Sequence, residues 1–137
     1  NWVGGGDGRP ANLRGQDLSG FDLANLELSG IKLRGAALRD ARIDNTTFQF
    51  ADLSGVDLRG CSAHNTTFAG CNLTGADLRN GRFSGSRFAS AEILSGTGER
   101  TGRRIYTDLS NARLAGATCD GVEWADAILH DVSGLEP

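Results

Sequence analysis

Large apolar side chains recur at every fifth position along most of this chain. The spacing runs without a break through seventeen five-residue units, here called pentads, from residue 11 to residue 95. Their central residues are Leu13, Leu18, Leu23, Leu28, Leu33, Leu38, Ile43, Phe48, Leu53, Leu58, Ala63, Phe68, Leu73, Leu78, Phe83, Phe88 and Ile93. A second small or apolar residue stands two positions before nearly every centre, so inward and outward positions alternate as they do in a β-strand. Each pentad is therefore predicted to contain a short strand.

Turn-forming residues close most of the pentads. The last position is Gly, Asn or Asp in most of them, as at Gly15, Asn25 and Asp40. These residue types tolerate the positive φ angles that tight corners require. The chain is predicted to alternate short strands with corners.

A longer repeat of twenty residues contains the pentads. Residues 45–48 read N-T-T-F, and the same four letters return at residues 65–68. Residues 71–80 likewise repeat residues 51–60, with each residue matched or conservatively replaced. A fixed period of this length is typical of solenoid proteins, in which each repeat stacks on its neighbours. Four pentads are thus predicted to form one coil.

The pentads closely resemble those of the pentapeptide-repeat family, whose motif is A(D/N)LXX. The match is plain at A-D-L-S-G (51–55), C-N-L-T-G (71–75) and A-D-L-R-N (76–80), and it extends over nearly the whole chain. The resemblance implies an all-β fold, a right-handed quadrilateral parallel β-helix with four pentads per coil. Twenty-two pentads would make about five and a half coils.

Stacking at intervals of twenty residues places the central side chains in columns. One column contains Leu28, Phe48, Phe68 and Phe88, so three aromatic rings are predicted to lie one above another at about the 4.8 Å spacing of neighbouring strands. The interior would be filled and dry, with no room for a pocket of several hundred Å³. We therefore expect a protein that is not an enzyme and that binds no cofactor or metal.

The five-residue spacing fails after Ile93 and resumes at Leu109. Residues 96–106 between them are polar, rich in Gly and net basic, so they are predicted to be an inserted loop that projects from a corner. The division predicted from the sequence is a cap at residues 1–10 with Trp2 covering the first coil, repeats at 11–95 and 107–131, and a tail at 132–137.

The net charge and the cysteine content argue against several classes of function. The net charge is −3, with a slightly basic middle and an acidic C-terminal end, so the chain is not a basic nucleic-acid binder. Cys61, Cys71 and Cys119 are odd in number and lack C-x-x-C spacing, which argues against disulfides and zinc. A bacterial, cytoplasmic protein with buried thiols fits best. No stretch is long and apolar enough to suggest a membrane span.

Two surface features are candidate partner contacts. The inserted loop offers Arg100, Arg103, Arg104 and Tyr106, since loops on rigid scaffolds commonly carry binding function. Surface insertions are also tolerated at little cost, which leaves a passive loop as the alternative. The second feature is a ridge of three arginines in one outward column, Arg39, Arg59 and Arg79. It could bind an acidic partner, or it could be a solvated face that Asp57 and Asp77 partly neutralise.

No catalytic motif is apparent. His64 and His130 lie at outward positions of different columns, where surface histidines are expected. The glycine-rich segment 96–102 lacks the Lys and the spacing of a phosphate-binding loop.

Two hypotheses for function remain open. The first is a non-enzymatic rigid scaffold or protein-interaction module that binds an unidentified protein, with no nucleic acid or membrane as partner. Such a module would either associate end to end with copies of itself or be fused to a larger protein. The second follows from the resemblance: some family members imitate DNA, bind type II topoisomerases such as gyrase and protect them from quinolones. A DNA mimic needs a high density of negative charge along its axis, whereas the middle of this chain is basic.

Overall fold

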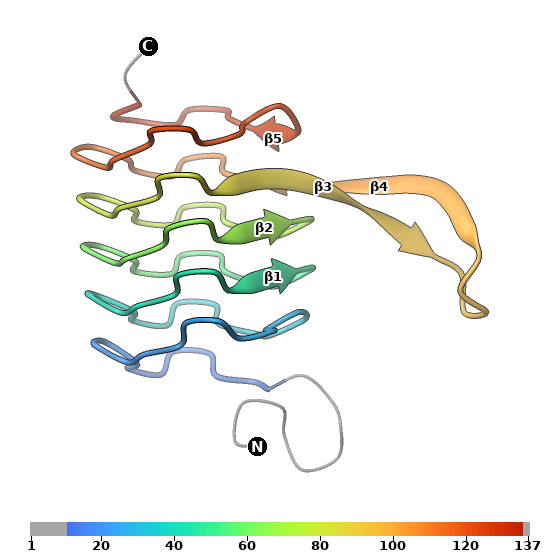
Figure 1. Ribbon diagram of the computed structural model, residues 1–137, viewed down its shortest axis with the longest axis horizontal. Helices are drawn as coiled ribbons and strands as arrows, with labels where there is room; N and C mark the ends of the chain where they lie inside the picture. The colour runs from blue at the N-terminus through green and yellow to red at the C-terminus, as the bar shows by residue number, and fades with distance from the viewer. Residues whose placement is uncertain (1–10, 136–137) are drawn as a thin grey trace.

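The computed structural model describes residues 11–135, which form a rod of stacked coils with a hairpin that projects from one side (Figure 1). Its strands are β1 (Thr47–Gln49), β2 (Thr67–Ala69), β3 (Arg87–Leu94), β4 (Arg100–Asp108) and β5 (Ala127–Ile128). Residues 11–135 contain no helix, and therefore no helix able to cross a membrane. The fold is all-β, as predicted.

Parallel bridges at intervals of twenty residues hold the coils together. One column runs from Asn12 through Lys32 and Asp52 to Asn72, each paired with the next. The backbone hydrogen bonds follow the same register, as where the Leu13 amide donates to the Lys32 carbonyl oxygen at 2.8 Å. β1, β2 and β3 are the places where this pairing lengthens into short strands. The twenty-residue coil read from the sequence is the coil of the structure.

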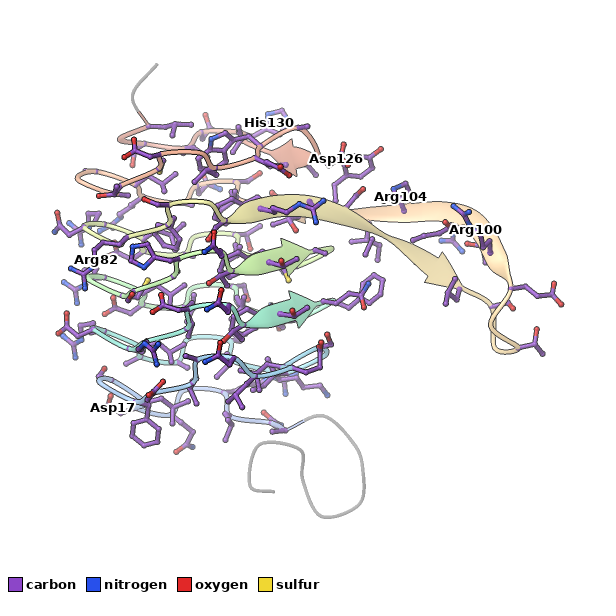
Figure 2. The ribbon with its side chains drawn as sticks, in the orientation of Figure 1. Asp17, Arg82, Arg100, Arg104, Asp126 and His130 are labelled. Atoms are coloured by element: carbon purple, nitrogen blue, oxygen red, sulfur yellow. The ribbon has the colours of Figure 1, made fainter. Side chains whose placement is uncertain are left out.

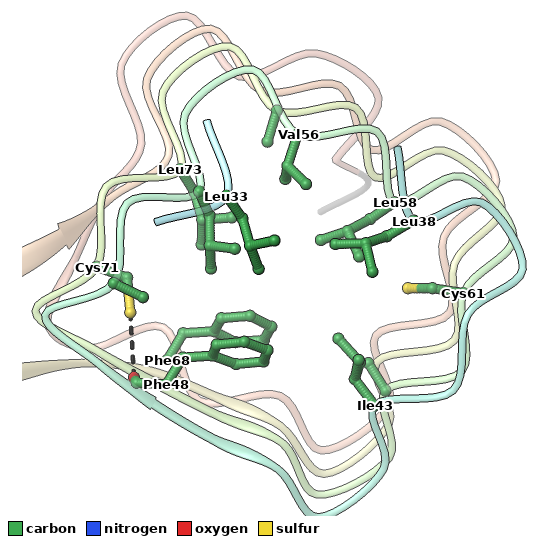
Figure 3. Packing of buried hydrophobic residues seen from close by; sticks show 14 of the residues in the cluster. Leu33, Leu38, Ile43, Phe48, Val56, Leu58, Cys61, Phe68, Cys71 and Leu73 are labelled. Atoms are coloured by element: carbon green, nitrogen blue, oxygen red, sulfur yellow. Dashed lines mark hydrogen bonds between the residues drawn. The ribbon is translucent and has the colours of Figure 1, made fainter. Parts of the chain in front are cut away.

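Corners recur every five residues. Every fifth residue from Gly15 to Gly85 has a positive φ angle, which gives four corners to each coil of twenty residues. The outline of the coils, viewed along the rod, has four sides (Figure 3). The handedness and the number of coils stay predictions.

Corner residues of neighbouring coils contact one another. Gly60 has a φ angle of 70°, and a Cβ atom added there would overlap a carboxylate oxygen of Asp40 in the coil before it. The Asp40 side chain thus uses space that only glycine leaves free.

We expect Gly60→Ala to lower the free energy of unfolding by about 1–2 kcal/mol, because an L side chain is strained at positive φ. The clash adds to this cost, and Asp40→Gly removes the clash but not the strain. Urea unfolding of the two single variants and the double variant measures both terms. Equal costs of Gly60→Ala with and without Asp40 would contradict the contact.

The core contains a column of stacked aromatic rings. The Phe48 and Phe68 ring centroids lie 5.3 Å apart with nearly parallel planes (Figure 3). Those of Phe68 and Phe88 lie 4.9 Å apart, also with nearly parallel planes. This confirms the predicted stack. Trp124 extends the column, with its ring 4.9 Å from Phe88.

Buried hydroxyl groups, which the apolar pattern did not predict, line the inner corners together with the predicted buried thiols. Thr46 and Thr66 are fully buried, and each donates from Oγ1 to the carbonyl oxygen of the residue twenty-three positions before it. The Cys71 thiol does the same to Phe48 (Figure 3). Within residues 11–135, every buried side-chain nitrogen or oxygen has a hydrogen-bond partner. The interior therefore satisfies its polar groups without water.

The inserted segment is an antiparallel hairpin of β3 and β4 that begins earlier than the sequence division placed it. The step between paired coils rises from twenty residues at Asp52 and Asn72 to thirty-six at Asn72 and Asp108, so residues 91–106 are additional. Ile93, which the sequence pattern predicts as the centre of the seventeenth pentad, lies instead in β3 outside the rod. Leu109 takes the place above Leu73 instead, since the Leu73 amide donates to the Asp108 carbonyl oxygen.

The two ends differ in what the structure describes. The predicted cap at 1–10, including Trp2, lies outside the described residues. At the other end, Ser133 pairs with Arg113 and donates its amide to the Ala112 carbonyl oxygen, so the residues after 131 continue the coil at least to Ser133.

Candidate functional site: the projecting hairpin and its root

The hairpin is a two-stranded ribbon that leaves the rod at one corner (Figure 1). Ser90 pairs with Tyr106, Ala91 with Ile105 and Glu92 with Arg104, and the register shifts between Glu92 and Leu94. Opposed residues of an antiparallel pair share a face. One face therefore carries Glu92 with Arg104, and the other carries Ala91 with Ile105.

Glu92 organises the charged face of the hairpin. Its carboxylate lies 2.8 Å from an Arg100 guanidinium nitrogen and 3.9 Å from one of Arg104, and it accepts the Gly102 amide at 2.9 Å. The hydrogen bond from Arg100 is the main reason that the pKa of Glu92 lies below its usual range. Sequence analysis missed Glu92 because it looked like an ordinary outward residue of a pentad.

The four loop residues predicted as contacts all lie on β4. Figure 2 shows Arg100 towards the tip of the hairpin and Arg104 nearer the rod. The Arg100 side chain is 82% exposed although it is paired with Glu92. Arg103 is exposed, and no carboxylate within residues 11–135 forms an ion pair with it. Tyr106 is 46% exposed at the root. The hairpin thus presents cations to solvent without being uniformly basic.

Hydrogen bonds fasten the root of the hairpin to the rod. Arg104 Nε donates to Ser90 Oγ at 2.8 Å, and Ser90 Oγ donates to Asp126 of the following coil at 3.0 Å. Thr107 is fully buried, donates to the Phe68 carbonyl oxygen and accepts the Cys71 amide. These bonds fix the angle at which the hairpin leaves the rod.

A groove of about 430 Å³ runs between the root of the hairpin and the rod. It is lined by Gly70, Cys71, Asn72, Arg104, Ile105, Tyr106, Asp108 and Ile128. Its walls combine apolar side chains with one cation and one carboxylate, which is the mixture found in sites that recognise an apolar group with a polar neighbour.

The predicted arginine ridge exists, but its charge is balanced. Arg59 lies 2.8 Å from the Asp57 carboxylate and Arg79 lies 2.7 Å from that of Asp77, each through two hydrogen bonds. Arg39 lies 3.5 Å from Asp57. The pKa values of Asp57 and Asp77 are lowered, chiefly by the hydrogen bonds from Arg59 and Arg79. The three arginines therefore form an ion-pair ladder with the aspartates rather than a free cationic surface.

This ladder makes the stability of the rod depend on pH. The folded-state pKa values of Asp57 and Asp77 lie below the unfolded value of about 3.9. Their contribution is present above that unfolded pKa and is lost as the pH falls through the folded pKa. We expect the free energy of unfolding to decrease below about pH 4. Urea unfolding from pH 2 to pH 7 should show a flatter profile for Asp57→Asn with Asp77→Asn, and an unchanged profile would contradict the ladder.

His64 belongs to a polar cluster on the surface. Its Nδ1 atom lies 3.2 Å from both Asp44 Oδ1 and Ser62 Oγ, and Ser62 donates directly to Asp44 at 2.7 Å. A catalytic triad would need the hydroxyl and the carboxylate on opposite nitrogens of the imidazole. The cluster therefore lacks the arrangement for proton relay.

Burial makes the Cys61 and Cys71 thiols poor nucleophiles. Cys61 and Cys71 are free and buried, and burial raises the pKa of each thiol to about 12. Thiolates are scarce at such pKa values near neutral pH. Cys119 is half-buried, and burial raises its pKa as well.

Sequence comparison agrees with the geometry of the coils. The profile of the family described as pentapeptide repeats matches the chain in eight copies, over residues 11–49, 22–60 and 51–89. These matches cover more than half of the chain. The chain belongs to the pentapeptide repeat family. No curated protein sequence matches this pentapeptide repeat protein significantly.

Solved pentapeptide repeat proteins share the fold. A trypsin-treated form of QnrB1, a plasmid-mediated fluoroquinolone resistance protein, matches with a TM-score of 0.51 and 24% identity, over 88% of this chain and 63% of that one. Full-length QnrB1 matches with a TM-score of 0.53 and 15% identity, over 85% and 69%. A pentapeptide repeat protein from the Arabidopsis thaliana thylakoid lumen matches with a TM-score of 0.34 and 25% identity, over 88% and 62%. The chain thus spans less than two thirds of the first structure. At these identities the likeness concerns the fold alone.

Proposed function

We propose that this pentapeptide repeat protein is a non-enzymatic protein-interaction module, in which a rigid rod holds the β3–β4 hairpin as the contact element. The observation that carries the proposal is that sixteen additional residues leave and rejoin the coil without disturbing its register. A solvated hairpin of this kind adds little to the stability of the rod, whereas rigid scaffolds often present binding loops.

The filled interior supports a binding role rather than catalysis. Core side chains such as Leu58, Phe68 and Leu73 are at most 1% exposed. No group of three His, Cys, Asp or Glu residues in the described part of the chain could hold a metal ion. A surface that can bind a partner is therefore the better candidate for function.

Affinity capture from cell lysate, with the intact chain and with a variant lacking residues 91–106, tests this proposal. We expect a protein partner that the intact chain retains and the variant loses. Recovery of the same partner by both forms would assign the contact to the faces of the rod and overturn the role of the hairpin. The variant must show an unchanged thermal melt for the comparison to count.

A second candidate is a topoisomerase-binding protein of the quinolone-resistance type. The shared fold with QnrB1 favours it, together with the projecting hairpin. The net charge of −3 and the balanced arginine ladder argue against imitation of DNA. Binding to purified DNA gyrase tests it directly: a DNA mimic should bind, and should lose binding when the acidic residues of the last coil, Asp120, Glu123, Asp126 and Asp131, are neutralised.

A further inference from the structure

Phe50 occupies a corner that the rest of the rod gives to smaller residues. Its φ angle is 58°, and every other residue of positive φ in the described part of the chain is Gly, Asn or Asp. A bulky side chain at positive φ is strained, and such strain tends to persist where a function needs the side chain. Phe50 is also 40% exposed, so packing in the core does not account for it.

The Phe50 ring lies at the root of the hairpin. A Cβ atom added to Gly70, the corresponding corner of the next coil, would come within 3.0 Å of two ring atoms of Phe50 and 3.3 Å of the Ala91 side chain. Ala91 is the residue of β3 that pairs with Ile105 of β4. The absence of a side chain at Gly70 therefore lets the aromatic ring lie across this corner, beneath the first residues of the hairpin.

Gly70 joins this ring to the groove. It lines the groove between hairpin and rod together with Ile105 and Tyr106. Ile105 and Tyr106 are 42% and 46% exposed. Ile105 lies on the face of β4 that carries Ala91, and Tyr106 lies on the opposite face with Arg104, so the two border the groove from the two faces of the strand. With Phe50 beside Gly70, three large apolar side chains near this corner are partly open to solvent, which is more than scattered single exposure.

The charged residues that line the groove differ between the hairpin side and the rod side. Arg104 stands on the hairpin side, and Asp108 on the rod side already accepts two hydrogen bonds from Ser110. The hairpin carries three arginines against Glu92 and Glu99, and Arg103 next to Arg104 has no ion-pair partner among residues 11–135. The hairpin side of the groove therefore carries more cations than carboxylates.

We propose that this corner, formed by Phe50, Gly70, Ile105 and Tyr106, is a docking site for an extended segment of a partner protein that carries a bulky apolar side chain beside an acidic one. The apolar side chain enters the groove at the root of β4, with Phe50 at the edge of the site, and the carboxylate pairs with Arg104 or Arg103. This inference rests on the proposed function and narrows it to one site and one chemistry of partner.

The substitution Phe50→Asn separates binding from folding. Asn is the residue at the corners Asn45 and Asn65, so it suits a φ angle of this sign. A structural role for the ring would make the variant less stable, whereas a binding role leaves the melting temperature unchanged or raised. The matched control is Phe21→Asn, at an aromatic residue of similar exposure in the first coil.

The test selects random displayed heptapeptides on the intact chain, with counter-selection on the chain lacking residues 91–106. We expect enriched peptides to contain Phe, Leu, Ile or Trp next to Asp or Glu. Synthetic copies should bind Phe50→Asn about tenfold more weakly or worse, as expected for the loss of an apolar anchor, and should bind Phe21→Asn as tightly as the intact chain. Arg104→Gln should weaken binding and reduce its dependence on salt.

Three outcomes would overturn the docking site. The first is no enrichment over the counter-selection, the second is equal binding by Phe50→Asn, and the third is enrichment of sequences from this chain itself, which would point to a second copy as the occupant. A partner captured from lysate through the hairpin but bound normally by Phe50→Asn would leave the proposed function intact while refuting this site. Capture independent of the hairpin would instead refute the proposed function.

Discussion

Replacing Phe68 by Ala should lower the free energy of unfolding by about 3–5 kcal/mol, the range for deleting a buried aromatic side chain. Phe68 is fully buried, and its ring is stacked between Phe48 at 5.3 Å and Phe88 at 4.9 Å. The substitution removes both stacking contacts and leaves a cavity inside one coil. Neighbouring coils are held in register by backbone hydrogen bonds on every side, so they cannot collapse to fill it.

Phe68→Leu is the matched control for this experiment. Leu28 occupies the same column two coils earlier, so a leucine has the right shape for the position and should cost clearly less than the alanine. Urea unfolding followed by circular dichroism would measure both variants. A loss below about 1 kcal/mol for Phe68→Ala would mean that the column is not the main source of core stability.

Excising residues 91–106 should leave the rod folded and abolish partner binding. The pairing of Asn72 with Asp108 shows that removal of these sixteen residues restores the twenty-residue step between coils. Ser90→Gly should accompany the excision, because the equivalent corners at Gly30 and Gly70 have positive φ angles. We expect a melting temperature within a few degrees of the intact protein, since the hairpin is largely solvated, and at least a hundredfold loss of affinity for the captured partner.

Removal of residues 91–105 is the control, because it shortens the chain by one residue fewer. The residues after the corner would then be displaced by one position, which exchanges inward and outward side chains in everything that follows. Leu109 and Leu114, both at most 1% exposed, would face water. This variant should lose the last coil, with a lower melting temperature and an earlier unfolding step. If both excisions behaved alike, the register would not control the fold.

The residue at which the hairpin begins could not be predicted from the sequence pattern. Residues 91–95 read A-E-I-L-S, which fits a pentad nearly as well as the true members do. A five-residue pattern describes only which side chains could face inward. Whether Ile93 does so depends on whether its strand pairs with the coil below or with β4, and here the pairing with β4 prevails.

The candidate site was predicted in part. The arginines of the inserted segment stood out because their charge interrupted the regular pattern, and the structure places Arg100 and Arg104 around Glu92. The ridge of Arg39, Arg59 and Arg79 was visible as well, but the distances to Asp57 and Asp77 that balance it were not. Phe50 was missed although the sequence carries its signal, an aromatic residue in a position reserved for corners.

The sequence by itself determined the repeat, the coil length, the aromatic column and the family, because each follows from short-range periodicity that every coil repeats. Only the tertiary structure decided where the chain leaves the coil, which charges neutralise one another and which side chains meet at the root of the hairpin. The exit and return of the chain depend on contacts between residues thirty-six positions apart, such as Cys71 with Thr107. The ion pairs depend on side-chain geometry that the pattern does not encode, even between residues as close in sequence as Asp57 and Arg59. The side-chain register within the coils follows from the sequence pattern. At the inserted segment, by contrast, the strand can pair either with the coil below or with β4, and only the folded structure shows which pairing forms.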